Sequence, residues 1–218
     1  MTVRRVLAGL ALVCGIAPAT TPARAVAQVD AWVAAGPTAG GLGLDDDLAD
    51  YRWDTRPATQ WGGRVLAGRG PFAVGLCAWR AGTSQGTGLP EVEGEPQVVL
   101  STLSAVGLVR VASPLGCEVW LGGQAGRLHA SWEPGELVVA TGGGAPVTVA
   151  FEDVDEWCLG FTAEVQRRLG RGLVAAVQAE RSTFALETAH RRGDVIELDR
   201  DRFSTWSARV QLAWRWPL

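Results

Sequence analysis

The residues from Trp206 to Leu218, WSARVQLAWRWPL, alternate between two kinds of side chain. Successive side chains of a β-strand point to opposite faces of the sheet, so this period of two predicts a strand whose faces meet different surroundings. The residues between the apolar ones are mostly polar or charged. The apolar face comprises Trp206, Ala208, Val210, Leu212, Trp214, Trp216 and Leu218. The fold depends on whether this face meets a protein core or lipid.

The same alternation recurs along the chain and predicts an all-β fold of eight strands. Residues 97–111 are apolar on both faces, so the sequence does not show which face points inward, and residues 117–132 change phase. The other strands are predicted at residues 29–35, 60–68, 71–80, 157–169, 172–184 and 206–218.

The connections between the predicted strands alternate in length. The short ones are residues 68–71, 112–116 and 169–172, and the long ones are residues 37–58, 81–96, 133–156 and 185–202. An up-and-down barrel with turns at one end and loops at the other has this arrangement. Outer-membrane barrels show the same asymmetry, with short periplasmic turns and long extracellular loops.

Residues 1–27 have the pattern of a secretory signal peptide. A basic start precedes a short apolar run at residues 6–18, and small residues stand at the candidate cleavage sites Ala25 and Ala27. The mature chain, residues 28–218, is therefore expected to be exported as one domain. Removing the three arginines of this leader lowers the formal charge from −3 to −6, which gives no electrostatic case for binding nucleic acid.

Tryptophan is unusually frequent, with ten residues against one tyrosine. Its ring prefers the boundary between hydrocarbon and water, so membrane barrels carry aromatic girdles near both ends of their strands. Phe72, Phe184 and Phe203 also stand near predicted strand ends. The predicted girdle tryptophans are Trp61, Trp79, Trp132, Trp157, Trp206, Trp214 and Trp216.

The faces opposite the apolar ones carry charged and amide side chains in the middle of the strands. We predict that these side chains point into the lumen and plug it, because an eight-stranded barrel is only wide enough for its own side chains. The predicted lumen residues are Arg64, Glu164, Gln166, Gln178, Glu180, Arg209 and Gln211.

With this leader, strand pattern and closing strand, the chain from residue 28 to residue 218 resembles the small bacterial outer-membrane β-barrel proteins of the OmpA-, OmpX- and OmpW-like kind. In that family the last strand carries the signal read by the barrel-assembly machinery. Val210, Leu212 and Trp214 match its apolar positions, and Trp216 matches its terminal aromatic residue. The resemblance implies a place in the cell outer membrane, with outer-membrane lipid, lipopolysaccharide and the assembly machinery as partners.

We therefore expect an eight-stranded antiparallel up-and-down transmembrane β-barrel with a structural or surface-interaction role and no enzymatic activity. Three alternatives stay open. They are a lipid A-modifying barrel enzyme, a narrow channel for small solutes, and a soluble secreted barrel of lipocalin type that binds an apolar ligand.

His129 and Ser131 are the candidate catalytic residues of the enzyme alternative. They resemble the His-x-Ser pair of the PagL-type lipid A deacylases, and a serine hydrolase needs such a base beside its nucleophile. However, Leu128, Ala130 and Trp132 read as the lipid-facing side of this strand. That phase turns His129 and Ser131 inward, away from an acyl chain. We therefore expect them to be polar residues of the lumen near the outer rim, without a catalytic role.

No cofactor and no metal are expected. The acidic loop at residues 44–54 lacks the spacing of an EF-hand. Cys77 and Cys158 fall on the third and sixth predicted strands, on opposite walls of the barrel, whereas a disulfide needs Cα atoms within about 7 Å. We therefore expect Cys77, Cys117 and Cys158 to be thiols.

Overall fold

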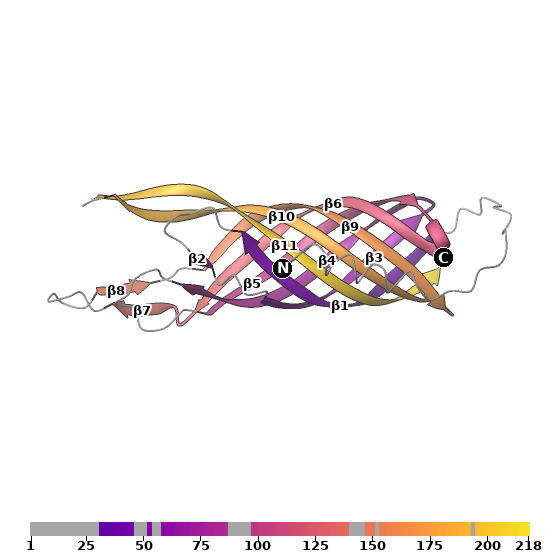
Figure 1. The fold of residues 1–218 in the computed structure, drawn as a ribbon, viewed down its shortest axis with the longest axis horizontal. Helices are drawn as coiled ribbons and strands as arrows, with labels where there is room; N and C mark the ends of the chain where they lie inside the picture. Colours follow the sequence, from indigo (N-terminus) through magenta and orange to yellow (C-terminus); the bar gives the residue numbers. More distant parts are fainter. Residues whose placement is uncertain are drawn as a thin grey trace.

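The computed structural model describes residues 31–45, 52–53, 58–86, 97–139, 147–150, 153–192 and 195–218, which form an elongated β-barrel (Figure 1). Its eight wall strands are β1 (Ala31–Asp45), β3 (Ala58–Arg69), β4 (Phe72–Gly86), β5 (Gln97–Ala112), β6 (Cys117–Glu133), β9 (Val154–Gly170), β10 (Leu173–Arg192) and β11 (Val195–Pro217). Within the described residues, no helix is long and apolar enough to span a membrane.

Every wall strand pairs antiparallel with the strands before and after it in the chain. The last strand, β11, also pairs with the first, β1, so that Val33 lies opposite Trp216 and Ala39 opposite Val210. The sheet is thus closed, and the predicted eight-stranded up-and-down barrel is confirmed. The predicted signal peptide, residues 1–27, lies outside the described residues.

One end of the barrel carries the short turns, and the C-terminus lies at the same end (Figure 1). These turns need backbone with positive φ, which glycine adopts without a steric penalty. Gly70 has φ 59° in the first turn, Gly116 has φ 77° in the second, and Gly172 has φ 88° in the third. The second turn also contains the short 3₁₀ helix Pro114–Gly116. We call this end the turn end.

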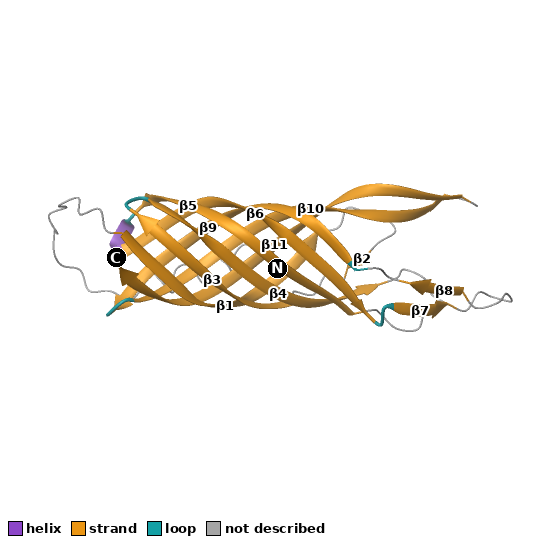
Figure 2. Ribbon diagram, turned by 180° about the vertical axis from the view of Figure 1, so that it is seen from behind, coloured by secondary structure: helices purple, strands orange, loops and turns teal. Residues whose placement is uncertain are grey.

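At the other end, the loop end, the strands run further than the sequence predicts. β10 and β11 stay paired as far as Arg192 opposite Val195, so the predicted loop 185–202 is mostly a projecting hairpin (Figure 2). Outside the bilayer neither face of a strand meets hydrocarbon. The alternation of apolar side chains therefore ends there, although the backbones of the two strands stay paired. Short strands occupy two other predicted loops: β2 (Arg52–Trp53) pairs with β4, and β7 (Glu136–Val139) pairs with β8 (Val147–Ala150).

The outer wall is apolar around the barrel. Exposed aliphatic and aromatic side chains come from six wall strands, and polar side chains are rare between them. Prominent members are Trp61, Val65, Phe72, Val74, Leu76, Leu103, Val109, Leu121, Trp157, Leu159, Phe161, Val210, Leu212, Trp214 and Trp216. Soluble proteins rarely expose a continuous apolar surface of this kind. The apolar face of the closing strand therefore meets lipid.

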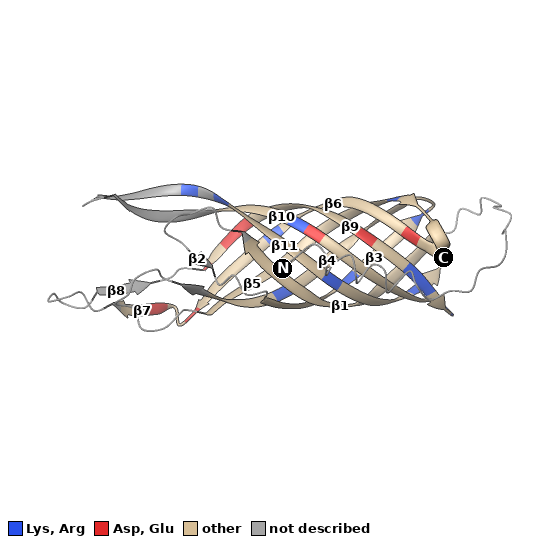
Figure 3. Ribbon diagram, in the orientation of Figure 1, with Lys and Arg blue, Asp and Glu red and all other residues tan. Residues whose placement is uncertain are grey.

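The interior has three layers, a polar middle between two apolar clusters that the sequence pattern did not predict. Along the inward face of β5, Val98 and Leu100 belong to a loop-side apolar cluster, Thr102 and Ser104 to a polar middle, and Val106 and Leu108 to a turn-side apolar cluster. On the ribbon, charged positions lie in the middle of the barrel and at its turn end, and further ones lie at the loop end (Figure 3). The structure thereby decides the facing of β5, which its sequence leaves open.

Candidate functional site: the barrel interior and its two rims

A buried ion pair crosses the polar middle of the lumen. Arg64 on β3 donates two hydrogen bonds to Glu164 on β9, with nitrogen–oxygen distances of 2.5 and 2.6 Å. Arg64 also donates to the side-chain oxygen of Gln211, and Gln166 donates to Glu164 at 2.9 Å. This bidentate geometry is the strongest form of an arginine–carboxylate contact.

A second buried ion pair joins β11 to β10. Arg209 donates to one carboxylate oxygen of Glu180, while the other oxygen accepts from Gln124 at 2.6 Å and from Ser182 at 2.9 Å. A further guanidinium nitrogen of Arg209 lies 3.8 Å from the sulfur of Cys77. Each buried arginine therefore has one carboxylate, and the charges of the polar middle balance.

All seven predicted lumen residues lie inside the barrel, and none is more than 6% exposed. Gln178, the one outside these two clusters, donates to Thr162 at 2.8 Å. The residues are Arg64, Glu164, Gln166, Gln178, Glu180, Arg209 and Gln211.

The predicted girdle tryptophans divide between the two faces of the wall. Trp61, Trp157, Trp214 and Trp216 are exposed on the lipid side, and the ring of Trp206 packs over Gly43. Their positions suit the lipid–water boundary.

The expectation is wrong for Trp79 and Trp132. Trp79 is only 5% exposed and belongs to the loop-side apolar cluster, against which Trp132 packs. Phe184 and Phe203 also lie in that cluster, as stacked rings 5.7 Å apart. A position near the strand end does not by itself place an aromatic ring in lipid, because alternation along the strand decides the face.

The predicted inward facing of His129 and Ser131 is also wrong. Leu128 and Ala130 are the buried residues of this stretch, so the two candidates point outward. Apolar residues face lipid where the lumen is polar, but β6 passes here into the apolar loop-side layer, where they face inward. Near the loop end, His129 Nδ1 lies 3.2 Å from Asp155 Oδ1.

A charged cluster that sequence reasoning missed lies at the turn end. The Glu118 carboxylate has three arginine neighbours, with nitrogen–oxygen distances of 3.6 Å to Arg110, 3.4 Å to Arg168 and 3.3 Å to Arg215. The Arg215 guanidinium lies 3.9 Å from the centre of the Trp32 ring. The inward phase of Trp32 could be read from the sequence, but the convergence of side chains from four strands could not.

Cys77, Cys117 and Cys158 form no disulfide, which confirms the expectation that they are thiols. The described residues contain no cluster of three or more histidine, cysteine or acidic side chains that could hold a metal ion. The acidic loop at residues 44–54 lies largely outside the described residues.

The arrangement of the wall defines the class of protein. A closed barrel with an apolar outer wall and ion pairs buried in its interior reverses the pattern of a soluble protein, and its outer surroundings are lipid. A soluble barrel of lipocalin type has the opposite arrangement and does not fit. The fold is that of a small outer-membrane β-barrel.

No protein-family model matches the chain, and no curated protein matches its sequence. Among solved structures, the chain is similar to outer membrane protein W of E. coli, at 16% identity and a TM-score of 0.48, over 86% of this chain and 98% of that one. It is also similar to Ail, the attachment invasion locus protein of Yersinia pestis, at 13% identity and a TM-score of 0.43, over 86% and 99%. For the outer membrane protease OmpT from Escherichia coli the values are 8%, 0.42, 90% and 99%. The last two names describe different roles, and neither role is carried over to this chain.

Proposed function

We propose that this protein is a plugged outer-membrane barrel with a structural and surface-contact role. The observation that carries the proposal is the buried polar layer, in which Arg64 pairs with Glu164 and Arg209 pairs with Glu180. A solute crossing the barrel would have to displace both pairs, and breaking a buried ion pair is strongly unfavourable. The narrow-channel alternative therefore ranks lower.

Conductance across a planar lipid bilayer tests this role. We expect the folded protein to give no regular steps of current. The double variant Arg64→Ala with Glu164→Ala removes both charges and their bulk, so it should conduct more than the native protein. Regular steps from the native barrel, unchanged in the double variant, would show that the polar layer does not close the lumen.

The loop end is the surface that we propose for contact outside the cell. The β10–β11 hairpin projects from the barrel there, with its pairing intact to Arg192 and Val195. A short epitope inserted between these two residues should be detected on intact cells. The same epitope inserted at Gly70, in the turn between β3 and β4, should be detected only after the outer membrane is permeabilised. The opposite result would invert the proposed orientation.

We further propose that lipopolysaccharide contacts the outer wall near the loop end. Three exposed arginines each pair across strands with an outward aromatic residue: Arg80 with Trp61, Arg127 with Trp157, and Arg181 with Trp206. The guanidinium of Arg127 lies 5.3 Å from the centre of the Trp157 ring. Aromatic rings mark the lipid boundary, so the arginines lie where the phosphates of outer-leaflet lipids begin.

This contact is tested by the heat needed to unfold the barrel in SDS. Lipopolysaccharide should raise the unfolding temperature of the native protein, and changing Arg80, Arg127 and Arg181 to glutamine should abolish the increase. Arg69→Gln, at the turn end of β3, is the matched control and should keep it. An increase that survives in the triple variant would argue against these contacts.

The barrel-assembly machinery is the partner that we propose during biogenesis. The outward row of β11, Val210, Leu212, Trp214 and Trp216, presents the apolar side chains expected of its signal. Folded membrane barrels resist SDS until they are boiled, so unboiled and boiled samples migrate differently on a gel. Trp216→Ala should reduce the amount of this heat-modifiable, folded form in cells, whereas Trp61→Ala on β3 should reduce it less. Equal losses would point to folding stability instead of recognition.

A hydrolase acting on lipid A is the second candidate function. Its supporting observation is a row of three side chains across neighbouring strands, in which Ser101 lies opposite His129, and His129 lies opposite Asp155. Asp155 is close enough to orient the imidazole ring. However, the other ring nitrogen, Nε2, lies 3.8 Å from Asp153, and among the described residues no hydrogen bond joins the ring to a serine. The candidate therefore ranks second.

Release of fatty acid from purified lipid A, measured by mass spectrometry, tests the hydrolase. Activity lost in His129→Ala and in either Ser131→Ala or Ser101→Ala would support it and identify the nucleophile. Native protein that releases no fatty acid, or activity kept in all three variants, would reject it.

A further inference from the structure

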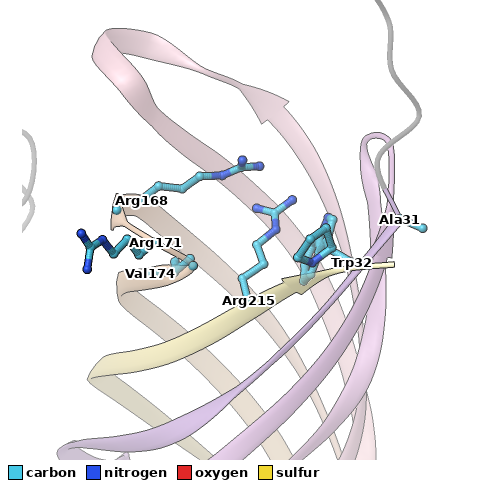
Figure 4. Close-up of a pocket in the computed structure, with 9 residues that line it drawn as sticks. Ala31, Trp32, Arg168, Arg171, Val174 and Arg215 are labelled. Carbon is cyan, nitrogen blue, oxygen red and sulfur yellow. The ribbon is translucent and has the colours of Figure 1, made fainter.

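The turn-end mouth of the barrel contains a cavity of about 380 Å³. Trp32, Arg168, Val174 and Arg215 line it, together with the turn between β9 and β10. The side chains of Arg168 and Arg215 point toward each other across the mouth, whereas the side chain of Arg171, which also lines the cavity, extends away from these two (Figure 4). Two like charges thus converge on one space.

The cations at this mouth are not balanced as they are in the middle of the lumen. Glu118 is the one carboxylate among the described side chains of these turns and adjoining strand ends. The arginines at this end include Arg69, Arg110, Arg168, Arg171 and Arg215. A single internal carboxylate cannot neutralise the three guanidinium groups that face it.

The distances show the same shortage. Charge-assisted hydrogen bonds from arginine usually measure about 2.7–2.9 Å. The contacts of Glu118 with Arg168 and Arg215 measure 3.4 and 3.3 Å, and one of its oxygens also accepts from Trp120 at 3.2 Å. Arg64 and Glu164 approach much more closely. Glu118 therefore leaves donor capacity at the mouth for another anion.

An apolar cluster lies beside the mouth and includes Trp32, one of its lining residues. Trp32 and Trp120 meet edge to face, with ring centres 6.0 Å apart, and both are almost completely buried. Because Arg215 stacks on Trp32, its guanidinium is held in place before any ligand arrives. A preorganised donor loses less conformational entropy on binding.

From these observations we propose that the turn-end mouth binds a phosphate group, held by Arg168 and Arg215 with help from Arg110. Paired guanidinium groups match the oxygens of phosphate, and the cavity has room for a group esterified to it. The phosphate belongs either to a soluble ester on the periplasmic side or to an anionic lipid headgroup of the inner leaflet. This inference is independent of the surface role proposed for the loop end.

Calorimetric titration of the folded barrel with inorganic phosphate, in nanodiscs of phosphatidylcholine at low ionic strength, tests the site. Arg168→Gln with Arg215→Gln should weaken binding by about tenfold or more, since it removes charge-assisted hydrogen bonds. Arg69→Gln, an exposed arginine at the turn end of β3 that does not line the cavity, is the matched control and should leave the affinity unchanged. Glu118→Gln should tighten binding, because it removes the competing internal carboxylate.

Heat-modifiable mobility shows first that each variant folds. If the double variant does not, the single Arg168→Gln replaces it, because that side chain is largely exposed and has no role in the core. No phosphate binding by the native barrel would overturn the proposal. So would equal binding by native and arginine variants, or weaker binding by Glu118→Gln.

The two sources of phosphate are separated by repeating the titration in nanodiscs of phosphatidylglycerol. Competition that abolishes phosphate binding there, and only when Arg168 and Arg215 are intact, identifies a lipid headgroup as the occupant. Binding that is unchanged between the two lipids identifies a soluble phosphate compound.

Discussion

The polar middle of the barrel interior and the loop-side layer next to it are built by the same strands but filled in different ways. In the middle, Glu164 accepts from Arg64 and Gln166 in fixed directions. In the loop-side layer, Leu100 and Leu128 pack with the stacked rings of Phe184 and Phe203. This apolar packing does not require a particular partner residue. A hydrogen-bonded pair depends on one register between distant strands, whereas apolar packing tolerates exchange of side chains of similar volume.

We therefore hypothesise that the polar layer specifies the register of barrel closure and the apolar layer supplies most of the stability. The pair Arg64 and Glu164 joins strands on opposite sides of the lumen. A one-residue slip of either strand would turn its charged side chain toward lipid. The following variants compare the two layers with each other and with the outer wall.

The largest loss is expected in the polar layer. Glu164→Ala leaves the buried Arg64 charge without its partner, and the free energy of unfolding should fall by about 3–5 kcal/mol. Equilibrium unfolding in guanidinium, from lipid vesicles and followed by tryptophan fluorescence, measures the loss. Adding Arg64→Met should restore much of the stability, since no charge is then left unpaired. A loss as small as that of a surface pair, about 1 kcal/mol or less, would show that water reaches Arg64.

A smaller loss is expected in the apolar layer. Leu100 is 1% exposed inside the barrel, whereas Leu103 on the same strand is 60% exposed on the outer wall. Leu100→Ala should lower the free energy of unfolding by about 3 kcal/mol, because the packed interior cannot close the cavity. Leu103→Ala should lower it less, because lipid chains fill the space. Equal losses in the same unfolding experiment would contradict the facing of β5.

The smallest of the three losses is expected on the lipid wall. Val210 lies midway between Trp206 and Trp214 and faces outward. Val210→Arg should cost about 2 kcal/mol, because a charge near the bilayer midplane is unfavourable. Leu218→Arg, beyond Trp216, is the depth control and should cost almost nothing. Similar costs at both positions would place Val210 in water.

The facing of a strand is predicted correctly from its sequence in the polar middle but not in the loop-side apolar layer. On β11, Arg209 and Gln211 alternate with Val210 and Leu212, and the structure has the predicted facing. On β6, the same reasoning assigned Leu128 to lipid and His129 to the lumen, and both are reversed. Apolar side chains indicate the lipid-facing side of a strand only where the inward-facing side chains belong to the polar layer. At Leu128, β6 lies beyond that layer, and its inward-facing side chains are apolar too.

Sequence alone therefore determined the number and order of the wall strands, the turn end and the loop end, and the facing of β3, β9, β10 and β11 where they cross the polar middle. These follow from the period of two and from turn chemistry, which are local properties of the chain. Only the tertiary structure decided the facing of β5, the inward position of Trp79 and the meeting of Arg110, Arg168 and Arg215 at Glu118. Each of these depends on which side chains from distant strands lie at the same height along the barrel axis. The register in which the strands pair around the closed barrel determines that height.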